Sequence, residues 1–224
     1  MVRAGLELVV FDMAGTTVDD VIDGVPLVLR SYDDALRRFG VEVPMEVLNE
    51  QRGRDKLTVI RELAGDRAAE VFNAFVETLK ENTGRVREMN GASEAFSFLR
   101  SRGVKVALNT GFPADVAQAI IDHLGWVEAG YVDGWICSEM VGRSRPDPAM
   151  IASLMARLGV EDPRRVMKVD DTAKGIEEGR NAGVATIGVL TGTQSRERLL
   201  RAGPTDVIPS VSHLPKYLRD NGYL

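Results

Sequence analysis

Short apolar runs recur along the chain, and most of them are bounded by Gly, Asp, Asn or Thr. Runs of this length are typical of strands buried on both faces of a parallel sheet. The predicted strands are Leu6–Phe11, Val104–Leu108, Trp135–Cys137, Val166–Val169, Ala185–Leu190 and Asp206–Ile208.

Between the later runs, apolar residues return every three or four positions, which predicts amphipathic helices. These helices are marked by Ala95, Phe96 and Leu99, by Ala117, Ile120, Ile121 and Leu124, by Ile151, Leu154, Met155 and Leu158, and by Gly175–Ala182. Strands that alternate with helices form parallel sheets with right-handed crossovers. The pattern therefore predicts an α/β fold with a doubly wound, Rossmann-like parallel sheet.

The segment between the first two strands has helical periodicity and no convincing strand. Val28, Tyr32, Ala35, Leu36 and Phe39 share one helix face, and Phe72, Phe75, Val76 and Leu79 share another. This segment is too long for one crossover helix. We therefore predict a small helical cap domain at residues 18–87, inserted into an α/β core domain made of residues 1–17 and 88–224.

Composition narrows the function by exclusion. The formal net charge is −5, so no overall positive field attracts nucleic acid. One cysteine, Cys137, and two histidines make a disulfide or a soft-metal site improbable, which favours a cytoplasmic location. The first apolar run, which ends at Phe11, is too short for a signal peptide or a membrane span. We therefore expect a small-molecule partner, without nucleic acid or membrane.

Polar residues follow several strands at the sheet edge where ligands of such folds bind. Asp12 follows the first strand, Thr110 the second, and Asp170 and Asp171 the fourth, while Arg145 precedes a helix. A carboxylate nucleophile with a hydroxyl, a guanidinium and Mg²⁺ suits phosphoryl transfer. Each residue alone has a structural alternative, since Asp caps helices and Asp-Asp-Thr forms turns. Their joint occurrence at successive strand ends favours the chemistry.

With these motifs the chain resembles the haloacid dehalogenase superfamily over essentially its whole length. The resemblance implies that Asp12 attacks phosphorus to form an aspartyl-phosphate. It implies a Mg²⁺ ion held by Asp12, the Ala14 carbonyl and Asp171, with Asp170 as a further candidate ligand. The residues it assigns to substrate or phosphate binding are Ala14, Gly15, Thr16, Gly53, Thr110, Gly111 and Arg145.

The residue at position 14 distinguishes between branches of this superfamily. Phosphatases of this superfamily usually carry there an Asp that protonates the leaving oxygen, whereas this chain has Ala14. General acid catalysis contributes ~10²–10⁴ in rate, so ester cleavage is disfavoured. The runs Asp12–Thr17 and Lys168–Thr172, together with Arg145, resemble the phosphonoacetaldehyde hydrolase branch. In that branch a cap lysine forms a Schiff base with the substrate aldehyde, and Lys56 in Gly53–Lys56 is the candidate.

A Schiff base requires the neutral amine of Lys56. An ordinary lysine has a pKa of ~10.4 and only about 0.04 % free amine at pH 7. Nearby Arg52, Arg54 and Arg61 would lower that pKa by like charge, and burial would add to the effect. From local sequence alone Lys56 is a solvated helix lysine, but Ala14 favours the functional interpretation.

Some features depart from the phosphonatase pattern. Arg52 and Val59 stand where well-known phosphonatases have Met and His, which leaves the substrate open. Gly175 stands where an acid is usual, and Asp170 is a candidate replacement. Two alternatives remain, a phosphatase or phosphomutase acting on a small phosphoester such as a phosphoglycolate-like compound, and a catalytically silent binding protein. A homodimer is compatible with the sequence.

Overall fold

The computed structural model describes residues 5–224 and contains a six-stranded parallel sheet in the order β10-β9-β8-β1-β6-β7. Its strands are β1 (Leu8–Phe11), β6 (Lys105–Thr110), β7 (Gly134–Cys137), β8 (Val166–Asp170), β9 (Ala185–Val189) and β10 (Asp206–Ile208). The predicted doubly wound sheet is confirmed. The first four residues of the predicted core range, 1–17, lie outside the described residues.

Two predicted strands end later than their apolar runs. Asn109 and Thr110 complete β6, and Asp170 completes β8. Thr110 is paired with Cys137 of β7, and Asp170 with Gly188 of β9. Pairing with a neighbouring strand therefore extends both strands into polar residues that the hydrophobic pattern assigned to loops.

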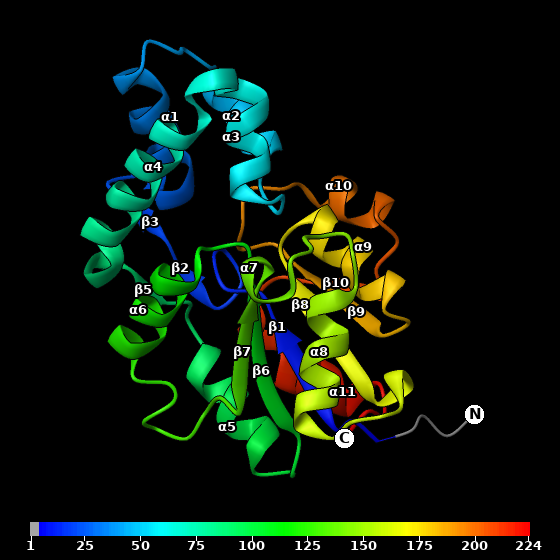
Figure 1. Cartoon of the computed structure of the whole chain (residues 1–224). Helices are drawn as coiled ribbons and strands as arrows, with labels where there is room; N and C mark the ends of the chain where they lie inside the picture. The colour runs from blue at the N-terminus through cyan, green and yellow to red at the C-terminus, as the bar shows by residue number, and fades with distance from the viewer. Residues whose placement is uncertain (1–4) are drawn as a thin grey trace.

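Helices cover both faces of the sheet (Figure 1). The helices of the core are α5 (Ala92–Arg100), α6 (Ala114–Leu124), α7 (Ser138–Val141), α8 (Ala149–Leu158), α9 (Ala173–Asn181), α10 (Arg196–Arg201) and α11 (Leu214–Asp220). Leu8 and Val10 face a cluster with α8, while Val9 and Phe11 face the larger cluster that includes α5, α6 and α11. All four residues of β1 are apolar, and successive side chains point to opposite faces of the sheet. Strand β1 therefore contributes apolar side chains to both faces. Among the described residues, no helix has the length and apolar character needed to cross a membrane.

Four of the α-helices between β1 and β6 stand over one end of the sheet (Figure 1). They are α1 (Leu27–Arg38), α2 (Met45–Glu50), α3 (Lys56–Ala64) and α4 (Ala68–Asn82). Helices α1 and α4 pack together through Tyr32 and Phe75, whose ring centroids are 4.7 Å apart. We call the segment from α1 to α4 the cap.

The expectation of no strand in this segment was wrong. The structure has the two-residue strands β2 (Val18–Asp19), β3 (Val21–Ile22), β4 (Val25–Pro26) and β5 (Arg87–Glu88). Strand β2 pairs with β5, and β3 with β4, both antiparallel. Two residues are too few to show alternation, so the pattern gave no sign of them. The β2–β5 pair joins the two chain segments that lead into and out of the cap.

Candidate active site

Asp12 lies directly beyond β1, at the centre of the sheet, and is 5 % exposed. Its backbone N–H donates to the Val169 carbonyl at 2.9 Å, which fixes its position relative to β8. The Arg145 guanidinium reaches its carboxylate from another loop, with Nη2 2.7 Å from Oδ1. The structure thus brings together the predicted nucleophile and the predicted phosphate-binding cation.

A buried polar network holds the Arg145 side chain. Arg145 Nε donates to Glu178 Oε2 at 3.1 Å, and Nη2 donates to the Asn109 backbone and side-chain oxygens at 2.9 Å each. Asn109 Nδ2 donates to both Glu178 oxygens, and Lys168 Nζ donates to Asn109 Oδ1. Burial would lower the pKa of Arg145, but Asp12, Asp170 and Glu178 raise it. The guanidinium is therefore charged and fixed in orientation.

Glu178 was missed by sequence reasoning, although a signal was present. It lies on the buried face of α9 with Gly175 and Gly179, three residues after one and directly before the other. A glutamate on a helix face of small, buried residues requires a polar partner. Burial raises the pKa of Glu178, opposed by Arg145 and Lys168.

The carboxylate of Asp170 is fully buried and is held by neighbours in the protein. Oδ1 accepts hydrogen bonds from the backbone N–H and the hydroxyl of Thr172, and Oδ2 lies 2.8 Å from Lys168 Nζ. Burial would raise the pKa of Asp170, but Lys168 and Arg145 outweigh it and lower the pKa. A Cβ atom at Gly175 would lie 1.9 Å from the Asp170 carboxyl carbon. Asp170 therefore fills the space that a side chain at residue 175 would need.

Asp171 has weaker partners than Asp170. Oδ2 of both side chains accepts no hydrogen bond, but Asp170 Oδ2 lies 2.8 Å from Lys168 Nζ, whereas Asp171 Oδ2 lies 3.9 Å from the Arg52 guanidinium. Asp171 Oδ1 accepts a hydrogen bond from Thr16 Oγ1 at 3.0 Å. The pKa of Asp171 is raised to about 8, chiefly by burial and also by the Asp12 and Asp170 charges, against the opposing effect of Arg52. A buried carboxylate of this kind needs a cation or a proton.

The acidic residues fit a hard divalent cation. Asp12, Asp170 and Asp171 each offer an oxygen that lies within 4.8 Å of the other two. Carboxylate and carbonyl oxygens are the ligands that Mg²⁺ prefers, and Asp171 Oδ2, which accepts no hydrogen bond, is a free donor for such an ion. The residues present therefore fit the metal that the sequence predicted.

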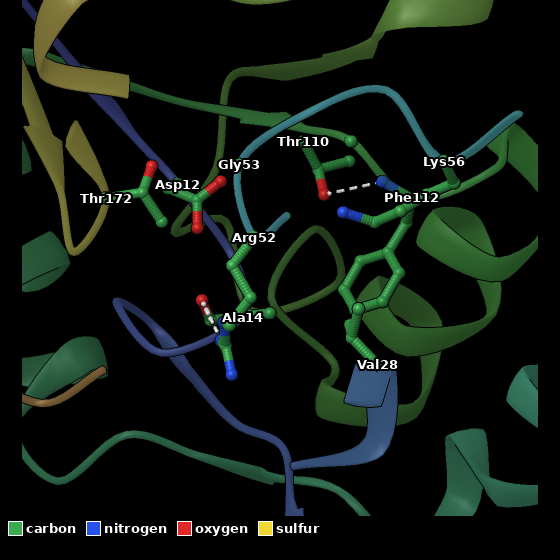
Figure 2. A pocket seen from close by; sticks show the side chains of 10 residues that line it. Asp12, Ala14, Val28, Arg52, Gly53, Lys56, Thr110, Phe112 and Thr172 are labelled. Carbon is green, nitrogen blue, oxygen red and sulfur yellow. Dashed lines mark hydrogen bonds between the residues drawn. The ribbon is translucent and has the colours of Figure 1, made fainter. Parts of the chain in front are cut away.

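A cavity of about 30 Å³ lies next to Asp12 and beneath the cap (Figure 2). Lys56 comes from the cap, and in the view of Figure 2 its side chain and that of Asp12 lie on either side of Thr110. The cavity is lined by Asp12, Ala14, Val28, Arg52, Gly53, Lys56, Thr110, Gly111, Phe112 and Thr172. A wider cleft of about 310 Å³ shares Lys56, Gly111 and Phe112 with it.

Lys56 is buried rather than solvated. It is the first residue of α3, is 7 % exposed, and donates from Nζ to the Arg54 carbonyl at 3.2 Å. Its pKa is lowered to about 8, chiefly by burial and also by the charges of Arg52 and Arg145, which outweigh the opposing charges of Asp12 and Asp55. The sequence also predicted a lowered pKa for Lys56. Besides Arg52, however, the arginine that lowers the pKa is Arg145 rather than Arg54 or Arg61. Arg54 instead pairs with Glu62 at 2.6 Å.

Some of the remaining predicted residues line the cavity, and the others contact Asp171. Gly53 and Gly111 line the cavity, and a Cβ atom at Gly53 would lie 2.7 Å from Thr172 Oγ1. Gly15 has a φ of +85°, and a Cβ atom there would lie 2.6 Å from Asp171 Oδ2. Gly15 and Thr16 therefore position Asp171 and do not line the cavity. Arg52, Val28 and Phe112 line it without having been predicted as binding residues.

Residues 6–183 match the model of a known family, described as haloacid dehalogenase-like hydrolase. The matched residues extend from β1 to the end of α9 and include all the site residues described above. The chain belongs to the haloacid dehalogenase-like hydrolases. The predicted superfamily is thereby confirmed.

Relatives within this family agree with the resemblance. Phosphonoacetaldehyde hydrolase of Bordetella pertussis is 34 % identical over 204 residues, covering 83 % of this chain and 72 % of the relative. The crystal structure of a phosphonoacetaldehyde hydrolase-like protein from Oleispira antarctica has a TM-score of 0.87 and 25 % identity, with 98 % and 94 % coverage. A structure described as a predicted phosphoglycolate phosphatase from Haemophilus somnus has a TM-score of 0.81 at 18 % identity, with 95 % and 97 % coverage, and shares the fold.

Proposed function

We propose that this hydrolase cleaves the carbon–phosphorus bond of phosphonoacetaldehyde or a close 2-oxoethylphosphonate. The observation that carries the proposal is the pairing of a buried lysine amine with the Asp12 carboxylate in one cavity, where residue 14 is an alanine. The names of the relatives from Bordetella pertussis and Oleispira antarctica support the same substrate class.

The Lys56 amine would condense with the aldehyde and release one water. With its pKa at about 8, roughly one tenth of the amine is neutral at pH 7. The protonated imine that results withdraws electrons from the adjacent carbon, which bears the phosphonate group. It therefore provides the electron sink that a carbanion leaving group needs.

The Asp12 carboxylate would then form an oxygen–phosphorus bond as the carbon–phosphorus bond breaks. The bond electrons pass into the imine, which becomes a neutral enamine, so no acid at Ala14 is required. One water hydrolyses the aspartyl-phosphate to phosphate. The enamine takes a proton at carbon, and a second water releases acetaldehyde from Lys56. The net reaction consumes one water.

In-line displacement places the attacking oxygen and the leaving carbon on opposite sides of phosphorus. Asp12 belongs to the core and Lys56 to the cap, which suits that requirement. Arg145 and Thr110 would bind the phosphonate oxygens. Asp12, the Ala14 carbonyl and Asp171 would hold Mg²⁺, which when bound offsets the repulsion between the carboxylate and the anionic phosphonate.

We assign Asp170 a positioning role in this site. Its oxygens already accept hydrogen bonds from Thr172 and lie close to Lys168, which leaves Asp171 as the better metal ligand. The close approach of Asp170 to Gly175 supports the idea that Asp170 takes the place of the acid that is usual at residue 175.

Borohydride trapping tests the proposal. Sodium borohydride with phosphonoacetaldehyde should reduce the imine to a stable secondary amine and add mass to one peptide. That peptide should contain Lys56 rather than Lys80, Lys105, Lys168 or Lys174. Label on another lysine, or no label during active turnover, would overturn the Schiff-base mechanism.

The matched variant is Lys56→Arg, which keeps the positive charge but cannot form an imine. We expect it to lose carbon–phosphorus cleavage completely. If Lys56 merely bound a distal anion, the arginine would be tolerated with mainly a raised KM. Cleavage retained in this variant would therefore remove Lys56 from the chemistry while leaving the Asp12 site in place.

A further inference from the structure

The guanidinium of Arg52 reaches from the cap into the acidic side of the site. Nη2 donates to the Ala14 carbonyl at 3.3 Å and lies 3.9 Å from Asp171 Oδ2 (Figure 2 shows the first contact). The side chain is 5 % exposed, so these contacts are made away from solvent. Gly15 permits the approach, because a Cβ atom there would lie 3.1 Å from the same nitrogen.

The two oxygens that Arg52 contacts are also two of the three oxygen donors assigned above to Mg²⁺. Resting on that assignment, we propose that Arg52 is a cap-borne cation that competes with the metal for the Ala14 carbonyl and Asp171. A guanidinium and a divalent ion repel each other strongly at such separations in a buried site. Metal binding therefore requires the Arg52 side chain to leave these oxygens.

Asp20 offers the displaced guanidinium another partner. Its Oδ1 lies 3.8 Å from Arg52 Nη2, and its Oδ2 is buried with no hydrogen-bond partner. Asp20 is 2 % exposed and lies between β2 and β3, at the base of the cap. A short movement toward Asp20 would satisfy this oxygen and free the metal ligands. The pair Asp20–Arg52 thus explains a buried carboxylate that the proposed reaction does not use.

The position of Arg52 connects metal binding to the cap. Arg52 directly precedes Gly53, which packs against Thr172 of the core, and lies four residues before Lys56. The same segment therefore carries the competing cation and the amine. While Arg52 contacts the metal ligands, it hinders the binding of Mg²⁺. Binding of Mg²⁺ therefore shifts this segment of the cap.

Calorimetric titration with MgCl₂, without substrate, tests the competition. Arg52→Met removes the charge and keeps an unbranched apolar stem, and we expect it to lower the Mg²⁺ dissociation constant by about tenfold or more. Arg54→Met removes a charge two residues away whose side chain pairs with Glu62, and should change the constant by less than about twofold. If Arg52→Met folds poorly with Asp20 unpaired, the double variant Arg52→Met/Asp20→Asn removes both charges and should also bind Mg²⁺ more tightly than Asp20→Asn alone.

A second readout separates displacement from simple repulsion. In protein labelled with ¹⁵N-arginine, the Arg52 guanidinium resonance, assigned by its loss in Arg52→Met, should shift on Mg²⁺ addition but not in Asp171→Asn. Unchanged or weaker Mg²⁺ binding by Arg52→Met, or an Arg52 resonance that does not respond, would overturn the competition. If Asp171→Asn binds Mg²⁺ as tightly as the native chain, the metal site of the proposed function fails as well.

Discussion

The burial of Lys56 lowers the pKa of its amine, which suits imine formation, but it also destabilises the fold. Its ammonium group is buried and donates a hydrogen bond to the Arg54 carbonyl. The folded state therefore holds the Lys56 pKa at about 8, below the ~10.4 of an unfolded chain. Between these values the unfolded chain binds more protons, so the Lys56 contribution to stability rises with pH across that range. Below about pH 8 Lys56 is protonated in both states, so the buried ammonium destabilises the fold by its full amount.

Lys56→Met should therefore raise the free energy of unfolding at pH 7 by about 2–3 kcal/mol, while carbon–phosphorus cleavage is lost. The gain should fall below about 1 kcal/mol near pH 10, because the unfolded lysine also begins to lose its proton there. Urea denaturation at the two pH values measures both quantities. Lys216→Met, at a site whose side chain is 73 % exposed, is the control and should change stability little. A Lys56→Met protein less stable than the native chain at pH 7 would contradict the burial argument.

Ala14 separates carbon–phosphorus cleavage from ester hydrolysis. It lines the cavity beside Asp12, and its side chain cannot donate a proton. In a phosphatase that has lost its acid, Ala14→Asp should restore ester hydrolysis by up to the ~10²–10⁴ of general acid catalysis. For the proposed phosphonatase we expect little gain on p-nitrophenyl phosphate and a loss of acetaldehyde release from phosphonoacetaldehyde, because the carboxylate crowds the small cavity. The opposite pair of rates would favour the phosphatase or phosphomutase alternative.

Helix α9 lies against the sheet through its glycines. A Cβ atom at Gly179 would lie 2.4 Å from Thr186 Cγ2 and 2.9 Å from Lys168 Cβ. Gly179→Ala should therefore lower the free energy of unfolding by about 1–3 kcal/mol despite the better helix propensity of alanine. Urea denaturation measures the effect. Gly84→Ala, where a Cβ atom has no neighbour within 4 Å, is the control, and equal effects at both sites would refute close packing.

The spacing of these glycines illustrates what the sequence predicts at the level of elements. Gly175, Gly179 and Gly183 recur every four residues, as on one face of a helix, but only the first two pack closely against the sheet. Gly183 instead follows the helix with a φ of +74°, and a Cβ atom there would lie 4.0 Å from Pro163 Cβ. A four-residue repeat cannot distinguish a helix interior from the turn that ends it. The six strands were predictable because each is a continuous buried run.

The site was predictable where residues follow strands and was missed where side chains meet across the fold. Asp12, Thr110 and Asp171 lie at strand ends, whose convergence in a parallel sheet is a general rule. From the sequence, Arg52 was considered as a neighbouring charge of Lys56 and as a departure from the phosphonatase pattern, but not as a residue that contacts the metal ligands. Its contacts with Ala14 and Asp171 depend on how the cap docks, and no local pattern encodes that placement.

At the scale of the whole molecule, the cap is fastened to the core on two sides. Lys80 of α4 forms an ion pair with Asp115 of α6. On the other side, Thr193 Oγ1 donates to Oδ1 of Asn49, a residue of α2, at 2.5 Å. The cavity beside Asp12 is about 30 Å³, much smaller than the adjoining cleft. We infer that a phosphonate reaches Asp12 only when the cap moves away from the core.

A cross-link between the cap and the core tests this movement. In the double variant Asn49→Cys/Thr193→Cys, the side chains in contact become thiols, and the natural Cys137 is buried. A short bis-maleimide joining the two thiols should reduce turnover of phosphonoacetaldehyde by more than about tenfold, because lid opening precedes both binding and product release. The same variant with each thiol capped by a mono-maleimide is the control and should retain most of its activity. Full turnover in the cross-linked protein would show that the substrate enters through the cleft beside Lys56 and Phe112 without opening of the cap.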